Sequence, residues 1–225
     1  MAIIKFSDVL ASSIHDIKNA LSLVINTIEE LALDQGMGLA GNPKVMRLQL
    51  EAQRANHDLI QLLVLYKYEN EKLTPNITEN NLQEFIEDVA IENQALAKAH
   101  GIEISTQCDA LLSGYFDENM IRGVINNALC NSLRYSRDHI LLSADESDGY
   151  TLIRVEDNGD GFSDDMLEKQ QAVNSSDNFT QGRTQLGLYF SNLIAQMHSN
   201  RERQGFFRLE NNINLSGGCF SIWLP

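Results

Sequence analysis

Apolar side chains recur at steps of three and four from residue 3 to residue 66, and this pattern constrains the fold more than any other feature of the 225-residue chain. The first series comprises Ile3, Leu10, Ile14, Ile17, Leu21, Val24, Ile28 and Leu31. The second comprises Val45, Leu48, Ala52, Ala55, Leu59, Leu62 and Tyr66. Each series predicts a long amphipathic helix with one apolar stripe. The glycine-rich stretch 34–43 must end the first helix, and Pro43 suits the first turn of the second.

A short connection between two such helices predicts an all-α helical hairpin with antiparallel helices. A single hairpin cannot bury two such stripes by itself. We therefore expect two chains to pair into a dimeric four-helix bundle, and the homodimer follows from the pattern alone.

The chain changes character after residue 69. The segment ENEKLTPNITENN is polar and contains Pro75, which is typical of a linker. Beyond it we expect helices at 82–99, 117–133 and 188–198, and strands at 102–108, 139–144, 150–156, 205–210 and 218–224. The turn from Ser147 to Gly149 predicts a hairpin, so the second half is expected to be an α+β two-layer sandwich and not a doubly wound parallel sheet. The predicted organisation is a helical domain at 1–73, a linker at 74–81 and an α+β domain at 82–225.

Charge and composition exclude several classes of partner. The chain has 17 Lys and Arg against 31 Asp and Glu, a formal charge of −14, and no basic run, so we expect neither nucleic-acid binding nor an anionic membrane surface as partner. No apolar run approaches the roughly 20 residues of a membrane span, and the N-terminus has no signal-peptide pattern, which predicts a cytoplasmic protein without membrane insertion. Only a short segment precedes the first helix, so no sensor domain is expected unless the chain is a fragment.

One polar pair stands out on the first helix. At about 100° per residue, His15 lies about 140° and Asn19 about 180° from the centre of the apolar stripe, so both are expected to face solvent. A solvated polar face explains such residues in most proteins. However, the string IHDIKNAL resembles the phosphoacceptor box of sensor histidine kinases. By that resemblance His15 is the nucleophile that receives a phosphoryl group, Asp16 holds its productive tautomer, and Asn19 positions a water for dephosphorylation of a response regulator.

The string NALCNSLRYS resembles the N box of the same family. Asn127 and Asn131 are one turn apart on a helix, and the resemblance assigns Asn131 to Mg²⁺ with Asn127 beside it in the nucleotide site. Arg134 is suited to a phosphate, and Tyr135 to packing beside the sugar or base. A solvated, asparagine-rich helix face is the alternative for this motif taken alone.

The string VEDNGDGF follows a predicted strand and resembles the first glycine box of the family. The resemblance implies that Asp157 accepts a hydrogen bond from the adenine amino group, while Gly159 and Gly161 allow the backbone to approach the ligand. The string is also a good turn by itself. A calcium loop is excluded because glycines occupy two ligand positions and Phe162 replaces the required glycine.

The string GRTQLGL resembles the second glycine box and the start of the helix that follows it, whose backbone amides hold phosphate. It contributes Gly182, Thr184, Leu186 and Gly187 to the expected cofactor-binding residues. Gln185 stands where the family has a central glycine.

Four motifs in the family's order make the chain resemble the cytosolic core of a two-component sensor histidine kinase, with a Bergerat or GHKL-type ATP-binding fold. The resemblance implies ATP and Mg²⁺ as cofactors, autophosphorylation of His15, and transfer to an aspartate of a response regulator, with dephosphorylation as a second activity. The alternative is a phosphotransfer, phosphatase or regulator-binding module with a degenerate nucleotide pocket, which the departure at Gln185 favours. A GHKL ATPase of the chaperone or topoisomerase kind is a third reading. The signal, the regulator and the choice of cis or trans transfer stay open.

Overall fold

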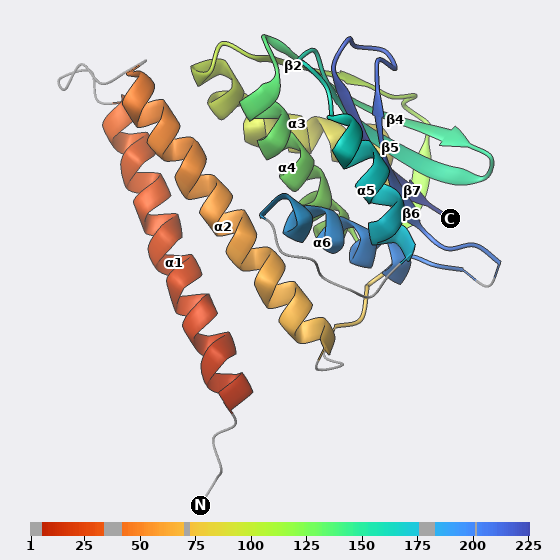
Figure 1. The fold of residues 1–225 in the computed structure, drawn as a ribbon, viewed down its shortest axis with the longest axis horizontal. Coiled ribbons are helices and arrows are strands. Elements are labelled where there is room, and N and C mark those ends of the chain that lie inside the picture. The colour runs from red at the N-terminus through yellow and green to blue at the C-terminus, as the bar shows by residue number, and fades with distance from the viewer. Residues whose placement is uncertain (1–5, 34–41, 70–72, 176–182, 201) are drawn as a thin grey trace, which may run out of the picture. The chain divides into compact units, whose positions relative to one another are not determined.

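The computed structural model describes residues 6–33, 42–69, 73–175, 183–200 and 202–225, and the side chains of residues 6–16, 29, 32–33, 43, 46, 169, 171–175 and 183–185 lie outside this description. The chain divides into two compact units, Met1–Thr74 and Pro75–Pro225 (Figure 1). None of the described helices combines the length and the apolar character that a membrane span needs.

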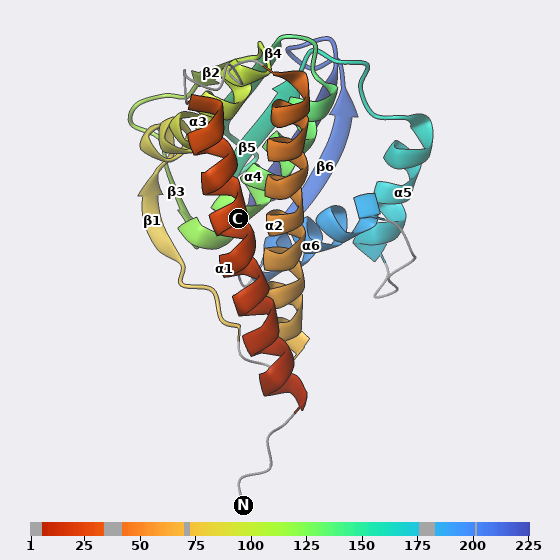
Figure 2. The same cartoon turned by 90° about the vertical axis from the view of Figure 1, so that its left-hand side faces the viewer.

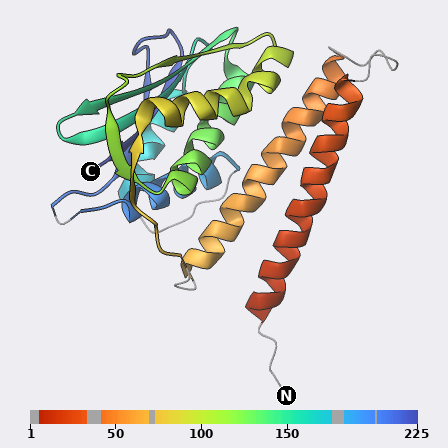
Figure 3. The ribbon, with the colours of Figure 1, turned by 180° about the vertical axis from the view of Figure 1, so that it is seen from behind.

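The first unit consists of two long helices, α1 (Phe6–Leu33) and α2 (Pro43–Glu69), that lie side by side with opposite directions (Figures 1 and 3). The second begins at Pro43, as expected. Their contact contains the buried side chains of Ile25, Ile28 and Ala52, against which Leu21 and Val45 pack. The sequence pattern therefore predicted both helices and part of the core between them, but did not include Ile25 in the stripe.

Each predicted stripe divides into a covered flank and an exposed flank. On α1, Leu21 and Ile28 belong to the buried cluster, whereas Ile17, Val24 and Leu31 are 52%, 47% and 37% exposed. The second stripe behaves in the same way, since Leu48 and Leu62 are 58% and 44% exposed. A single hairpin thus leaves a continuous part of each apolar stripe exposed to water. This exposure costs free energy, and the predicted dimer would remove it by burying these side chains.

The second unit has the expected α+β architecture, built on a mixed five-stranded sheet of order β2-β4-β5-β7-β6. Its strands are β2 (Glu103–Gln107), β4 (His139–Ser147), β5 (Tyr150–Asp157), β6 (Phe206–Asn211) and β7 (Gly218–Leu224). Only the pairing of β2 with β4 is parallel. The predicted hairpin joins β4 to β5, where Asp148 and Gly149 both adopt the positive φ that a two-residue hairpin turn requires.

Helices α3 (Leu82–Ala99), α4 (Glu118–Tyr135) and α6 (Arg183–Met197) cover one face of this sheet (Figures 1 and 2). Alternate residues on the strands supply the core beneath them, because successive side chains of a strand point to opposite faces. The buried residues on that face include Ile140, Leu142, Ile153, Val155, Phe207 and Ile222. The opposite face is not covered by these helices.

Strands β1 and β3 and helices α5 and α6 differ from the sequence prediction. The expected linker at 74–81 is wrong over its last part, because Thr78–Asn81 form strand β1, which pairs with β3 (Ser113–Phe116) in a separate two-stranded sheet. Asn81 then caps α3 by accepting a hydrogen bond from the Glu84 amide at 2.9 Å. Helix α5 (Asp164–Ser175) occupies part of a stretch expected to be loop. Helix α6 starts five residues before its predicted beginning at residue 188.

Candidate nucleotide site

Asp157 lies at the end of β5, at the centre of the predicted nucleotide site. Asp157 is buried, with 6% of its surface exposed. Its Oδ1 accepts hydrogen bonds from the Gly159 amide at 2.8 Å and the Gly218 amide at 3.3 Å. Its Oδ2 accepts one long bond of 3.4 Å, from the hydroxyl of Ser132 on α4. One carboxylate oxygen is therefore held by the backbone, and the other retains capacity for a further donor.

The backbone approaches Asp157 closely because glycines stand around it. A Cβ on Gly159 would lie 2.2 Å from the carbonyl oxygen of Tyr135, and one on Gly217 would lie 2.5 Å from both the backbone oxygen and Oδ1 of Asp157. No side chain fits at either place. The structure therefore joins the end of α4, the turn after β5 and the start of β7 around one carboxylate.

The rest of the turn after β5 is fixed by asparagines. Asn158 Oδ1 accepts hydrogen bonds from three successive amides, those of Arg137, Asp138 and His139, at 3.1, 3.3 and 3.2 Å. Gly161 has a φ of +80°, and a Cβ there would meet the side chain of Asn211 at 2.8 Å. The Asn211 side chain in turn binds both the amide and the carbonyl of Phe162. Gly161 is thus a structural part of the turn, which agrees with the interpretation of this string as a turn, while its role in nucleotide binding stays a prediction.

Helix α4 carries the four predicted residues of the N box. Asn127 is half-buried, whereas Asn131, Arg134 and Tyr135 are exposed near the end of the helix. The Arg134 guanidinium lies 5.4 Å from the centroid of the Tyr135 ring, a cation–π contact that keeps the two side chains together. Amide, guanidinium and aromatic groups therefore line the same end of α4 that contributes Ser132 to Asp157.

The start of α6 meets α4 at Gly187. A Cβ on Gly187 would lie 2.7 Å from Nδ2 of Asn127, so the absence of a side chain permits this approach. Leu186 is half-buried and lies in the first turns of α6. Thr184 is in the helix but its side chain lies outside the description, as does that of Gln185, and Gly182 lies outside the described residues altogether. Because α6 begins at Arg183, the backbone amides of its first turn lack acceptors within the helix.

The predicted phosphoacceptor residues belong to the other unit. His15 and Asp16 lie on α1, but their side chains are outside the description. Asn19, one turn further, is exposed, which agrees with the expected solvent-facing side of the helix.

Sequence reasoning missed three residues around Asp157: Ser132, Gly217 and Gly218. Ser132 follows Asn131 directly, and its seryl side chain gave no signal of its own. The glycine pair at the start of β7 was assigned only to the closing strand, although two successive glycines before a strand are a recognisable sign of a close backbone approach. These contacts join segments that are far apart in the sequence, so only the fold reveals them.

The part of the chain that carries Asp157 is similar in sequence to known proteins. Residues 116–225 match the family model described as histidine kinase-, DNA gyrase B-, and HSP90-like ATPase. Over 195 residues the chain is 26% identical to the sensor histidine kinase GraS of Staphylococcus haemolyticus, covering 82% of this chain and 53% of GraS. Over 187 residues it is 28% identical to the sensor histidine kinase CpxA of Escherichia coli, covering 80% of this chain and 39% of CpxA. The chain thus spans about half the length of the first relative and about two fifths of the second.

Solved structures show a related fold at low sequence identity. The Acinetobacter baumannii histidine kinase AdeS superposes with a TM-score of 0.57 at 16% identity, covering 93% of this chain and 96% of the AdeS chain. Full-length ShkA in complex with AMPPNP superposes with a TM-score of 0.62 at 19% identity, covering 96% of this chain and 45% of the ShkA chain.

Proposed function

We propose that the chain is a cytoplasmic histidine kinase core, because residues 116–225 match the histidine kinase-like ATPase model and the chain is similar to two sensor histidine kinases. In this proposal it binds ATP with Mg²⁺ beside Asp157, transfers the γ-phosphoryl group to His15, and passes it to an aspartate of a response regulator. Dephosphorylation of that regulator, with Asn19 positioning the attacking water, is the second activity of the same site.

The observation that carries the proposal is the buried carboxylate of Asp157. Its Oδ1 is occupied by the amides of Gly159 and Gly218, whereas Oδ2 has only the long bond from Ser132. A buried carboxylate oxygen with spare capacity favours a ligand that brings its own donor. The amino group of adenine is such a donor.

The phosphate end of the nucleotide is assigned to α4 and the start of α6. Asn127 and Asn131 supply oxygen ligands of the kind that Mg²⁺ prefers, with Asn131 as the metal ligand. Arg134 and the first-turn amides of α6 complement phosphate charge. The bound ATP supplies the phosphoryl group, and Mg²⁺ neutralises the charge of its phosphates. A chain with a formal charge of −14 depends on this metal to hold a polyanion.

His15 is the proposed acceptor. A neutral imidazole nitrogen is a good nucleophile near pH 7. The bond that forms joins this nitrogen to the γ-phosphorus, while the bond to the bridging oxygen breaks and ADP leaves with the electron pair. The exposure of Asn19 one turn away supports a solvent-facing acceptor that both the ATP-binding unit and a regulator can reach.

The exposed flanks of α1 and α2 support the dimeric four-helix bundle as part of this proposal. Ile17, Val24 and Leu31 on α1 and Leu48 and Leu62 on α2 are apolar and open to solvent in the single chain. A second hairpin placed against both flanks would bury them, as in other four-helix bundles.

Nucleotide binding is the step that can be tested with a matched pair of variants. We expect Mg²⁺·ATP to raise the melting temperature of the wild type, because a ligand that binds only the folded state stabilises it. Asp157→Asn should remove this shift. Asp160→Asn should keep it, since the Asp160 side chain is 97% exposed in the same turn and, among the described residues, forms an ion pair only with Arg137 at 3.1 Å.

The alternative of a degenerate pocket makes the opposite prediction. If the wild type shows no shift with Mg²⁺·ATP, the nucleotide site is not functional, and a phosphotransfer or regulator-binding module becomes the better account. A shift of equal size in the Asp157→Asn variant would refute the role given to that carboxylate.

A further inference from the structure

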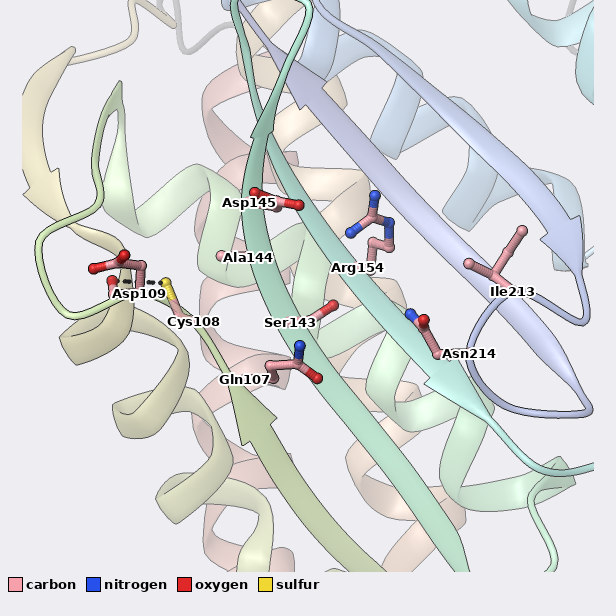
Figure 4. Close-up of a pocket in the computed structure, with 9 residues that line it drawn as sticks. All are labelled: Gln107, Cys108, Asp109, Ser143, Ala144, Asp145, Arg154, Ile213 and Asn214. Carbon is pink, nitrogen blue, oxygen red and sulfur yellow. Dashed lines mark hydrogen bonds between the residues drawn. The ribbon is translucent and has the colours of Figure 1, made fainter.

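The uncovered face of the five-stranded sheet contains a polar cleft of about 500 Å³ that the nucleotide site does not use (Figure 4). Its floor is one row of side chains across three strands, because Gln107 of β2 pairs with Ser143 of β4, and Ser143 pairs with Arg154 of β5. Paired residues in a sheet project from the same face. Arg154 is therefore separated from Asp157, whose side chain projects from the opposite face of the same strand.

One wall of the cleft is the loop between β6 and β7, which is tied down at Asn214. The Asn214 amide and side chain donate to the two oxygens of Glu156 at 2.8 and 2.7 Å. Glu156 is 1% exposed, so this loop is anchored to a buried carboxylate on the cleft side of β5. The cleft is therefore a fixed feature of the sheet surface.

Ser143 supplies an unpartnered donor and acceptor at the centre of the floor. It is 6% exposed, and its hydroxyl has no hydrogen-bond partner in the described part of the chain. A buried hydroxyl without a partner costs free energy, so buried polar groups are nearly always paired with protein, water or ligand. In Figure 4 the hydroxyl oxygen of Ser143 points toward the side of the cleft where Arg154 lies.

Side chains of opposite charge line the cleft, and no ion pair joins them in the described part of the chain. Arg154 is the one cation among the nine described residues that line the cleft, and no hydrogen bond or ion pair engages its guanidinium within the described chain. Asp145 lies two positions beyond Ser143 on β4, and Asp109 follows β2 at the same end. Both carboxylates are held by backbone amides, from Glu146 at 2.8 Å and from Leu111 at 2.9 Å. The pKa of the neighbouring Cys108 thiol is raised by burial and then by Asp109 and Asp145, which indicates a negative potential at this end.

We propose that this cleft binds a small zwitterion of the α-amino acid class, whose carboxylate is held by Arg154 with the Ser143 hydroxyl and whose ammonium group faces Asp145, with Asp109 adding to the negative potential at that end. A simple anion would gain from Arg154 but would be repelled by the two carboxylates. A simple cation would be attracted by the two carboxylates but repelled by Arg154. Only a ligand that carries both charges satisfies both ends of the cleft and the hydroxyl between them.

Chemical-shift titration of the ¹⁵N-labelled full chain tests this site without reference to kinase activity. The probes are pools of the twenty common L-amino acids. We expect at least one pool to shift the amides of Ser143, Asp145 and Arg154. The active amino acid is then compared with its carboxamide, which lacks the carboxylate, and its N-acetyl derivative, which lacks the ammonium group. Each should bind about tenfold more weakly or worse, because each loses a charge-assisted contact.

Arg154→Ala and Ser143→Ala should both weaken binding of the active amino acid, by about tenfold and by several-fold respectively. Arg208→Ala is the matched control, because Arg208 lies in the same row of the sheet, beyond Ser221, but outside the cleft. The proposal is overturned if no pool shifts these amides, if the carboxamide or the N-acetyl derivative binds as tightly as the amino acid, or if Arg208→Ala weakens binding as much as Arg154→Ala.

Discussion

At the scale of single residues, the nucleotide site depends on glycines, which have no side chain, as much as on residues with functional side chains. Gly159, Gly217 and Gly187 each stand where a Cβ would meet another group at under 3 Å. At Gly159 and Gly217 the obstacles include backbone atoms, which cannot move cheaply, whereas at Gly187 the obstacle is the Asn127 side chain. The glycine motif in the sequence predicted Gly159 and Gly187, but the role of Gly217 required the fold.

Gly187→Ala separates nucleotide binding from stability. The methyl group would lie 2.7 Å from Asn127 Nδ2 and must displace that side chain, which we propose to lie beside the metal. Alanine also favours a helix over glycine by about 1 kcal/mol, so the free energy of unfolding should change little or rise. We expect weaker binding of Mg²⁺·ATP by calorimetry with an unchanged or higher melting temperature.

Gly123→Ala is the control for this substitution. Gly123 also lies in a helix, but a Cβ there would meet only the Phe190 ring, at an ordinary 3.6 Å. The affinity of the Gly123→Ala variant for Mg²⁺·ATP should equal that of the wild type. Equal affinities for all three proteins would argue against a role for Asn127 at the metal.

His198 is a buried residue whose protonation opposes folding. It is 3% exposed at the end of α6, where Nδ1 lies 2.7 Å from the Ile194 carbonyl and Nε2 accepts a hydrogen bond from the Asp117 amide at 3.0 Å. Burial lowers the pKa of His198 from 6.5, against the smaller raising effects of Ile194 and Asp117. The neutral ring is favoured in the folded state, so its stabilising effect is complete above pH 6.5 and is lost as the pH falls toward the lowered value.

The free energy of unfolding should therefore fall between pH 7.5 and pH 5.5, as urea denaturation would measure. His198→Gln should be less stable at neutral pH but should show a flatter dependence over the same range. Parallel curves for the two proteins would mean that His198 does not titrate in this interval. No local sequence pattern shows this role, because the pairing of His198 with Asp117 spans 81 positions.

At the scale of helices and strands, periodicity predicted the long elements and failed for the short ones. Helix α3 has the predicted bounds, and β4 and β5 are joined at the predicted Asp148–Gly149 turn. The four-residue strands β1 and β3 were missed, because four residues are too few to establish an alternating pattern. Strand β1 also lies in a polar segment next to Pro75, where composition indicated a linker, and it is stabilised by pairing with a strand that is distant in sequence.

The two flanks of α1 give a prediction at this scale. Val24 lies on the exposed apolar flank that we assign to the dimer, whereas Leu23, which is 67% exposed, lies about 100° away on the helix. Val24→Glu would place a charge in the bundle core and should shift the protein from dimer to monomer in sedimentation equilibrium. Leu23→Glu should leave the dimer intact. Dissociation by both variants or by neither would contradict the assigned interface.

At the scale of the whole molecule, the sequence indicated a helical part and an α+β part with a boundary near Pro75, and the structure divides at Thr74 and Pro75. The two binding sites were harder to predict from the sequence than the boundary between the two units. Motifs placed Asp157 and the glycines in one turn, but the cleft at Arg154 and Ser143 arises from strand register, which no local pattern specifies. The formal charge of −14 bears on both proposed sites, because each would have to hold a negatively charged ligand group with few cationic side chains.

The central claim is that ATP phosphorylates His15, and incorporation of ³²P from γ-labelled ATP in the presence of Mg²⁺ tests it most directly. The account predicts acid-labile, alkali-stable labelling of the wild type, no labelling of His15→Gln, and wild-type labelling of the control His100→Gln, since His100 lies at the end of α3 and bonds to Leu96. Sedimentation should show that His15→Gln remains a dimer. Undiminished labelling of His15→Gln would contradict the claim.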